Sequence, residues 1–131
     1  MDPADRIELH ELATRYGDLV DARDWEGLSE VFTDDVVYGS PAMPGQDLVG
    51  IAIVRKWMGR QRHPIAHHIT NIRVEEDEQG VRLRSRVILI GDDGTSRSGE
   101  YLDEVRPTPA GWRICRRSFT ARVRPDTDRP A

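Results

Sequence analysis

The sequence predicts an α+β fold in which helices come first and an antiparallel sheet follows. Apolar residues recur at spacings of three and four in the N-terminal half, which is typical of amphipathic helices. They then recur at every second position in four segments that are separated by turn sequences, which is typical of an antiparallel meander. We therefore expect a curved sheet packed on three N-terminal helices, in the shape of a half-open, cone-shaped α+β barrel.

The first helix is expected to begin after Asp2 and to end near Asp21. Asp2 can cap the helix, and Pro3 suits its first position because proline lacks the N–H that would otherwise stay unpaired there. An apolar stripe then follows for about three turns. Its members are Leu9, Leu12, Ala13, Tyr16, Leu19 and Val20.

Two more helices and a short strand are expected before the meander. Residues 24–32 predict a short helix, residues 36–38 a strand, and residues 39–47 a loop rich in glycine and proline. A third helix is expected over residues 48–60. Its inward residues are expected to be Val49, Ala52, Ile53 and Trp57.

The period of two begins at Ile65 and continues nearly to the end of the chain. The four expected strands cover residues 65–74, 81–90, 96–105 and 112–123. Residues 1–124 are expected to form one domain, and residues 125–131, with two prolines and three charges, a disordered tail.

Composition excludes several classes of protein. The chain has 131 residues, a length that suits a single domain, and its net charge of −4 argues against nonspecific nucleic-acid binding. Its longest aliphatic run, residues 87–90, is far shorter than the ~20 residues of a membrane helix. We do not expect the acidic N-terminus to act as a secretory signal, and the single Cys115 excludes an internal disulfide. We expect a cytoplasmic protein without a membrane or nucleic-acid partner.

No cofactor or metal signature is present. The sequence lacks a glycine-rich phosphate loop, a CxxC pair and an HExxH motif. His67 and His68 are neighbours on an expected strand, so they point to opposite faces and are poorly placed to ligate one metal. Cys115 lies mid-strand, where a packed side chain is the simpler interpretation. We expect neither a metal nor a cofactor.

Five polar residues, Tyr16, Asp21, Tyr38, His67 and Asn71, stand out as candidates for chemistry. Asp21 could equally be a helix cap or a solvated carboxylate, because helical phase does not place it in the apolar stripe. His67 could equally be a histidine of the core. If the two meet, the carboxylate would fix the imidazole tautomer and raise its basicity, so that the other ring nitrogen could move a proton near pH 7.

The motifs of the chain resemble those of SnoaL-like proteins, which have the nuclear-transport-factor-2-like, cystatin-like fold. The resemblance covers about residues 7–122 and is specific for the fold and much less so for the reaction. It is carried by residues 15–25, by Val31, Phe32 and Tyr38, by residues 67–71, and by residues 99–104 and 111–114.

Within this superfamily the chain resembles most closely the branch of scytalone dehydratase and hexachlorocyclohexane dehydrochlorinase. That resemblance implies that Asp21 and His67 take the positions of the catalytic aspartate and histidine, and that His68 takes the position of an aromatic ring. A slip of one residue would exchange His67 and His68. Tyr16 resembles a tyrosine that precedes the aspartate by five residues in a bile-acid dehydratase of this fold.

The chain also departs from its relatives. Val20 stands where scytalone dehydratase has a tyrosine, and no histidine follows His68 to supply that enzyme's second one. Residues 38–40 lack the base of ketosteroid isomerase. Arg106 could correspond to an arginine of the dehydrochlorinase pocket, but a solvated strand-end arginine is the simpler interpretation.

The resemblance implies a cofactor-free lyase or isomerase acting on a hydrophobic cyclic compound such as a steroid or polyketide. His67 and Asp21 would act as general acid and base, with Tyr16 donating a hydrogen bond. The expected substrate-binding residues are Tyr38, Trp57, His68, Asn71 and Phe119. The alternative is a non-catalytic ligand-binding or assembly domain. In either case we expect a homodimer that associates through the exposed face of the sheet.

Overall fold

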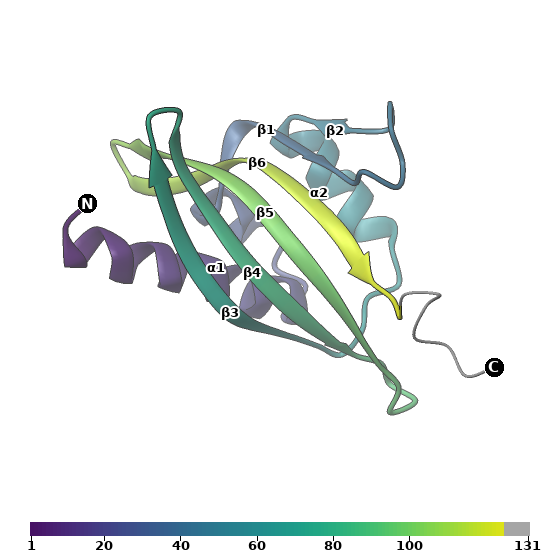
Figure 1. Cartoon of the computed structure of the whole chain (residues 1–131). Coiled ribbons are helices and arrows are strands. Elements are labelled where there is room, and N and C mark those ends of the chain that lie inside the picture. Colours follow the sequence, from purple (N-terminus) through teal and green to yellow (C-terminus); the bar gives the residue numbers. More distant parts are fainter. Residues whose placement is uncertain (125–131) are drawn as a thin grey trace.

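The computed structural model describes residues 1–124, and within them helices precede a long sheet (Figure 1). The first half contains α1 (Pro3–Asp21), the 3-10 helix η1 (Glu26–Glu30), β1 (Phe32–Gly39), β2 (Leu48–Val49) and α2 (Ile51–Arg60). The second half contains β3 (Ala66–Asp77), β4 (Gly80–Ile90), β5 (Ser96–Thr108) and β6 (Gly111–Arg122). The prediction for residues 125–131 lies outside the described residues.

The strands form one open, mixed sheet of six strands in the order β2-β1-β6-β5-β4-β3. Strands β3 to β6 make the predicted antiparallel meander, and β1 joins its edge in parallel to β6. The sheet curves over the helices (Figure 1). The predicted α+β class and its curved, mixed sheet are therefore confirmed.

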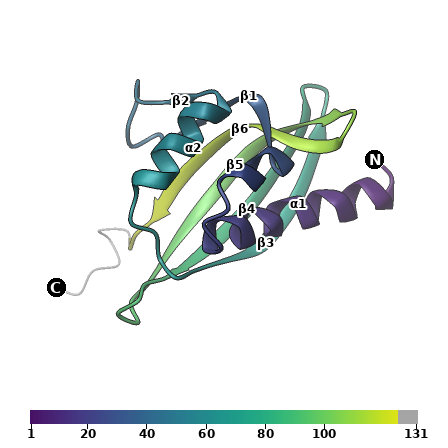
Figure 2. The same ribbon diagram turned by 180° about the vertical axis from the view of Figure 1, so that it is seen from behind.

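Both α-helices and η1 lie on the same face of the sheet (Figure 2). The helices enclose the core because the apolar stripe of α1 faces the inner side chains of the strands. Burial of these side chains removes apolar surface from water, which is the main stabilising contribution to folding. The fully buried apolar members include Leu9, Leu12, Ala13, Val20, Leu28, Val31, Val36, Val54, Leu83, Val87 and Ile114.

The predicted start of the first helix is confirmed, but the second and third helices differ from the prediction. Asp2 caps α1, since its carboxylate accepts a hydrogen bond of 2.9 Å from the Asp5 N–H. The second helix is a single 3-10 segment, and Phe32 belongs to β1. The third begins only at Ile51, because residues 48–49 pair with β1 as a strand.

The inner face of α2 also differs from the expected one. Ile51, Val54 and Met58 are buried, whereas Ile53 is 49% exposed and Trp57 40% exposed. The helix is therefore rotated by about one residue from the predicted phase. In the described part of the chain, no helix is long and apolar enough to cross a membrane.

Candidate active site

Asp21 and His67 are brought together where α1 ends beside the start of β3. Asp21 Oδ1 accepts a hydrogen bond of 2.7 Å from His67 Nδ1, and Oδ2 accepts one of 3.1 Å from the His67 backbone N–H. The carboxylate thus fixes both the backbone and the ring of His67. Helical phase alone places Asp21 off the apolar stripe of α1, and these two hydrogen bonds hold its side chain inward.

Two neighbouring residues allow this close approach of helix and strand. Gly17, one turn before Asp21, faces the His67 carbonyl so closely that an added Cβ would lie 2.8 Å from its oxygen. Arg23 donates hydrogen bonds to the carbonyls of Val20 (2.7 Å) and Pro64 (3.1 Å). The end of α1 is therefore tied to the segment that enters β3.

The protonation of His67 follows from its surroundings. Its side chain is 6% exposed, and burial lowers its pKa below the ordinary value of 6.5, although the hydrogen bond and charge of Asp21 oppose this shift. The ring is therefore neutral at pH 7. Because a carboxylate only accepts, we assign the ring proton to Nδ1, which leaves the lone pair on Nε2.

Aromatic rings extend from His67 into the interior. The Tyr16 ring lies edge-on to the rings of His67 (6.4 Å between centroids) and Tyr101 (5.6 Å). Burial raises the pKa of Tyr38 and Tyr101 well above 10, and the nearby Tyr16 adds to both shifts. All three tyrosines of the chain therefore gather around one point of the interior, where their hydroxyl groups can donate hydrogen bonds.

A buried ion pair lies beside these tyrosines and was missed by sequence reasoning. Arg117 donates hydrogen bonds of 2.8 and 2.9 Å to the two carboxylate oxygens of Asp103, and neither side chain is exposed. The guanidinium carbon of Arg117 lies 4.2 Å from the ring centroid of Tyr16 and 3.8 Å from that of Tyr101. Within residues 1–124, Arg117 Nη1 and the Ser85 hydroxyl are buried without a hydrogen-bond partner.

Charge and burial compete at this ion pair. Burial raises the pKa of Asp103 despite the nearby guanidinium. Burial by itself would lower the pKa of Arg117. The charge and hydrogen bonds of Asp103 outweigh that effect and hold the pKa of Arg117 above its ordinary value. The sequence did carry a signal, because Asp103 alternates with Tyr101 and Val105 and so shares their buried face.

The other predicted site residues divide between the two faces of the sheet. The Phe119 ring lies 5.5 Å from the Tyr101 ring, and the Trp57 ring 6.3 Å from the Tyr38 ring, so these aromatic side chains belong to the inner side. His68 and Asn71 are exposed on the opposite face, away from the Asp21 carboxylate.

Asn71 is turned outward by a bulge in β3. The register with β4 shifts between Thr70 and Arg73, and Asn71 has a φ of 51°. Arg106 was considered above as a pocket arginine or a solvated one. It is at the surface, where it pairs with Asp35 at 2.8 Å. Its interpretation as a surface arginine is confirmed.

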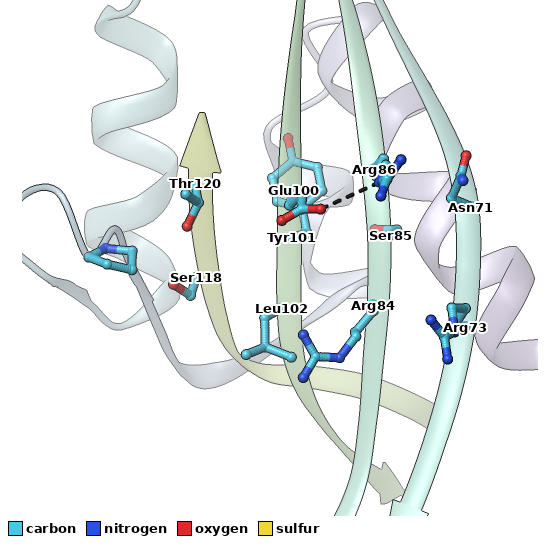
Figure 3. A pocket seen from close by; sticks show the side chains of 11 residues that line it. Asn71, Arg73, Arg84, Ser85, Arg86, Glu100, Tyr101, Leu102, Ser118 and Thr120 are labelled. Atoms are coloured by element: carbon cyan, nitrogen blue, oxygen red, sulfur yellow. Dashed lines mark ion pairs between the residues drawn. The ribbon is translucent and has the colours of Figure 1, made fainter. Parts of the chain in front are cut away.

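A cavity of about 280 Å³ opens at the end of the sheet near His67. Leu89, the cross-strand partner of His67, lines this cavity together with His63, whose ring centroid is 6.3 Å from that of His67. A second cavity, of about 300 Å³, lies on the outer face (Figure 3). Neither cavity is lined by Asp21 or His67 themselves. Among residues 1–124, no three histidine, cysteine or acidic side chains converge as metal ligands.

The family model of the SnoaL-like domain matches residues 2–118. The chain belongs to this family. The uncharacterized protein Rv2910c of Mycobacterium tuberculosis is 30% identical to it over 128 residues, which cover 89% of this chain and 85% of the relative. The SnoaL-like assignment made from the sequence is therefore confirmed.

Solved structures support the same fold. An NTF2-like protein with a cystatin-like fold from Novosphingobium aromaticivorans has a TM-score of 0.79 and 28% identity, covering 95% of this chain and 86% of its own. A candidate aromatic ring hydroxylase from the same organism has a TM-score of 0.77 and 27% identity, covering 95% and 93%. A candidate scytalone dehydratase, also from that organism, has a TM-score of 0.70, 20% identity and coverage of 87% and 81%, and shares the fold.

Proposed function

We propose that this SnoaL-like protein is a cofactor-free lyase or isomerase that uses Asp21 and His67 as a general acid–base dyad. The observation that carries the proposal is the 2.7 Å hydrogen bond from His67 Nδ1 to Asp21 Oδ1 around a neutral, largely buried imidazole. A positioned imidazole whose free nitrogen is unprotonated at pH 7 is suited to remove a proton from carbon.

In the proposed reaction, His67 Nε2 takes a proton from the carbon next to a substrate carbonyl. The electron pair of that C–H bond forms a carbon–carbon double bond, and the π pair of the carbonyl moves onto its oxygen, which becomes the enolate oxygen and accepts a hydrogen bond from the Tyr16 hydroxyl. The protonated imidazole, stabilised by Asp21, then returns its proton. Delivery to a leaving hydroxyl gives water and a double bond, whereas delivery to another carbon gives an isomer.

A hydrophobic cyclic substrate such as a steroid or polyketide fits the aromatic character of the inner side. Tyr38, Trp57 and Phe119 supply ring surfaces, and the cavity beside His63 and Leu89 is the proposed entrance. His68 and Asn71 lie on the other face and have no role in this scheme.

The experiment follows exchange of the carbon-bound proton, so that it needs no final product. The protein is incubated in D2O with a panel of cyclic ketones and β-hydroxyketones of steroid and polyketide type, and loss of the proton next to the carbonyl is measured by NMR. We expect His67→Ala and Asp21→Asn each to lower the exchange rate by about a hundredfold or more. His68→Ala, the matched histidine control, should retain the rate of the unaltered protein.

Full exchange in the His67 or Asp21 variant would refute the dyad. The second candidate is a non-catalytic ligand-binding or assembly domain, which is favoured by the absence of Asp21 and His67 from the linings of both cavities described above. Ligand binding by the unaltered protein without any proton exchange would support that candidate. We also propose that the protein is a cytoplasmic homodimer, and a monomer in sedimentation velocity would contradict this.

A further inference from the structure

The inner face of the sheet is built of rows of side chains, because cross-strand partners lie side by side and every second residue of a strand points inward. From the entrance cavity of about 280 Å³ inward, the rows are His67–Leu89–Arg97, Ile69–Val87–Gly99–Ala121, Ser85–Tyr101–Phe119 and Leu83–Asp103–Arg117. Leu89 and Arg97 of the first row line that cavity. The unpartnered donors of Ser85 and Arg117 belong to the third and fourth rows, and neighbouring rows are about 7 Å apart.

The ring of Phe119 covers the second row, between the entrance cavity and these donors. Phe119 is the direct cross-strand partner of Tyr101, but its ring leans diagonally over Gly99. A Cβ added to Gly99 would collide with Cε2 of the ring and would lie 2.8 Å from its Cζ. Glycine at position 99 therefore provides the space in which the ring lies.

The backbone of Gly99 gives no other reason for a glycine there. Gly99 lies inside β5, where glycine weakens a strand because it has no side chain to pack. Its φ is not positive, so an ordinary residue could adopt the same conformation. The close approach of the Phe119 ring is the contact that excludes a larger side chain.

A second ring covers the same rows from the helical side. The Tyr16 ring of α1 lies 6.4 Å from the His67 ring in the first row and 5.6 Å from the Tyr101 ring in the third. Tyr16 is 2% exposed, whereas Phe119 is only half-buried. Of the two rings, Phe119 is therefore the one that borders solvent and has room to turn.

We propose that Phe119 determines which substrates reach the buried donors, because its ring occupies, over Gly99, the place that a ring of the substrate must take. When the ring turns away, Gly99 and Ala121 leave a floor of small residues on which a flat ring system can lie. A cyclic ketone on this floor has the Ser85 hydroxyl in the next row, where it can donate to the ketone oxygen. The ketone class rests on the proposed function, but the closure of the passage by Phe119 does not.

The test is the binding of cyclohexanone, a single ring with a carbonyl acceptor, followed through the backbone amide shifts of the whole chain by NMR. In the unaltered protein the ring must first be displaced, and the apparent affinity is reduced by the fraction of molecules in which the passage is open. We expect Phe119→Ala to bind cyclohexanone at least about tenfold more tightly, with shifts that extend from Leu89 to Ser85 and Tyr101. Phe119→Leu retains more of the apolar packing, so it serves if the alanine variant does not fold, and its gain should be smaller.

Ile114→Val is the control for a general loosening of the core. It removes one methyl group from a fully buried side chain that pairs with Val105, beyond the fourth row, and should leave the affinity unchanged. The proposal would be overturned by an equal gain in this control, by the lack of a gain in both Phe119 variants, or by shifts at Ser85 in the unaltered protein at the affinity of Phe119→Ala. Because the titration measures binding alone, an inactive dyad would leave its outcome unchanged, and its failure would leave the proton-exchange experiment valid.

Discussion

Gly17 is the residue whose replacement tests most directly how the fold positions the Asp21–His67 pair. An alanine Cβ at this position would lie 2.8 Å from the His67 carbonyl oxygen and 3.2 Å from Ile69 Cγ1, whereas ordinary contact begins at 3.4 Å. The carbonyl belongs to the strand backbone and cannot turn aside. Gly17→Ala should therefore push α1 away from β3 by about 0.6 Å, the difference between 2.8 and 3.4 Å.

That displacement has two measurable consequences. In a helix interior alanine is more stabilising than glycine by about 0.5–1 kcal/mol, but overpacking costs about 1–3 kcal/mol. The free energy of unfolding should therefore fall, by up to about 2.5 kcal/mol. Moved rigidly with the helix, Asp21 would lie about 3.3 Å from His67 Nδ1 instead of 2.7 Å. Because the hydrogen bond that His67 donates to Asp21 raises the His67 pKa, weakening this bond should lower that pKa further.

Urea unfolding measures the first consequence, and NMR titration of the imidazole measures the second. Gly59→Ala is the matched control, since the new Cβ on α2 would meet only Trp25 at 3.6 Å. It should leave the His67 titration unchanged and make the protein as stable or slightly more stable. The reasoning would be refuted if Gly17→Ala increased the stability and left the pKa of His67 unchanged.

Two further predictions concern buried charge and pH. Arg117→Met leaves Asp103 buried without its partner and should lower the free energy of unfolding, measured in urea, by about 3–5 kcal/mol. Arg62→Gln, at the exposed ion pair with Asp92, is the control and should change that free energy little. Equal effects of the two substitutions would contradict the burial argument. The folded pKa of His67 lies below its unfolded value of 6.5, so the unfolded chain binds more protons as the pH falls through that window. The stability contributed by His67 should thus be complete above about pH 7 and be lost on acidification. His67→Gln should reduce this loss between about pH 7.5 and 5. If the free energy of unfolding fell just as steeply with pH in the variant, the ring would not be desolvated.

The sequence predicted the order of the elements because each long element has a clear apolar period. It failed where a bulge changes that period, since a bulge has no reliable residue signature. In β6, alternation from the buried Ile114 would direct Arg116 inward, but the register shift between Glu104 and Val105 of β5 places Arg117 there. In β3, the bulge likewise moved Asn71 to the outer face.

The rotation of α2 has a different cause. Two apolar sets compete on this helix at helical spacing, one containing Ile53 and Trp57 and the other containing Ile51, Val54 and Met58. Pairing of residues 48–49 with β1 decides between them, because the helix can begin only after Gly50, whose φ is 93°. This pairing is a tertiary contact, and the spacing of apolar residues along the helix cannot predict it.

The buried ion pair bears on whether the interior is a site or a scaffold. Burying two charges is expensive, and well-packed apolar residues are often at least as stable in their place. Packing alone does not require the unpartnered donors that remain in the described chain, Arg117 Nη1 and the Ser85 hydroxyl. Both groups lie on the inner side with Tyr16 and Tyr101, where a substrate carbonyl could accept a hydrogen bond from either of them. The energetic expense of this centre therefore favours chemistry at the inner face over packing alone.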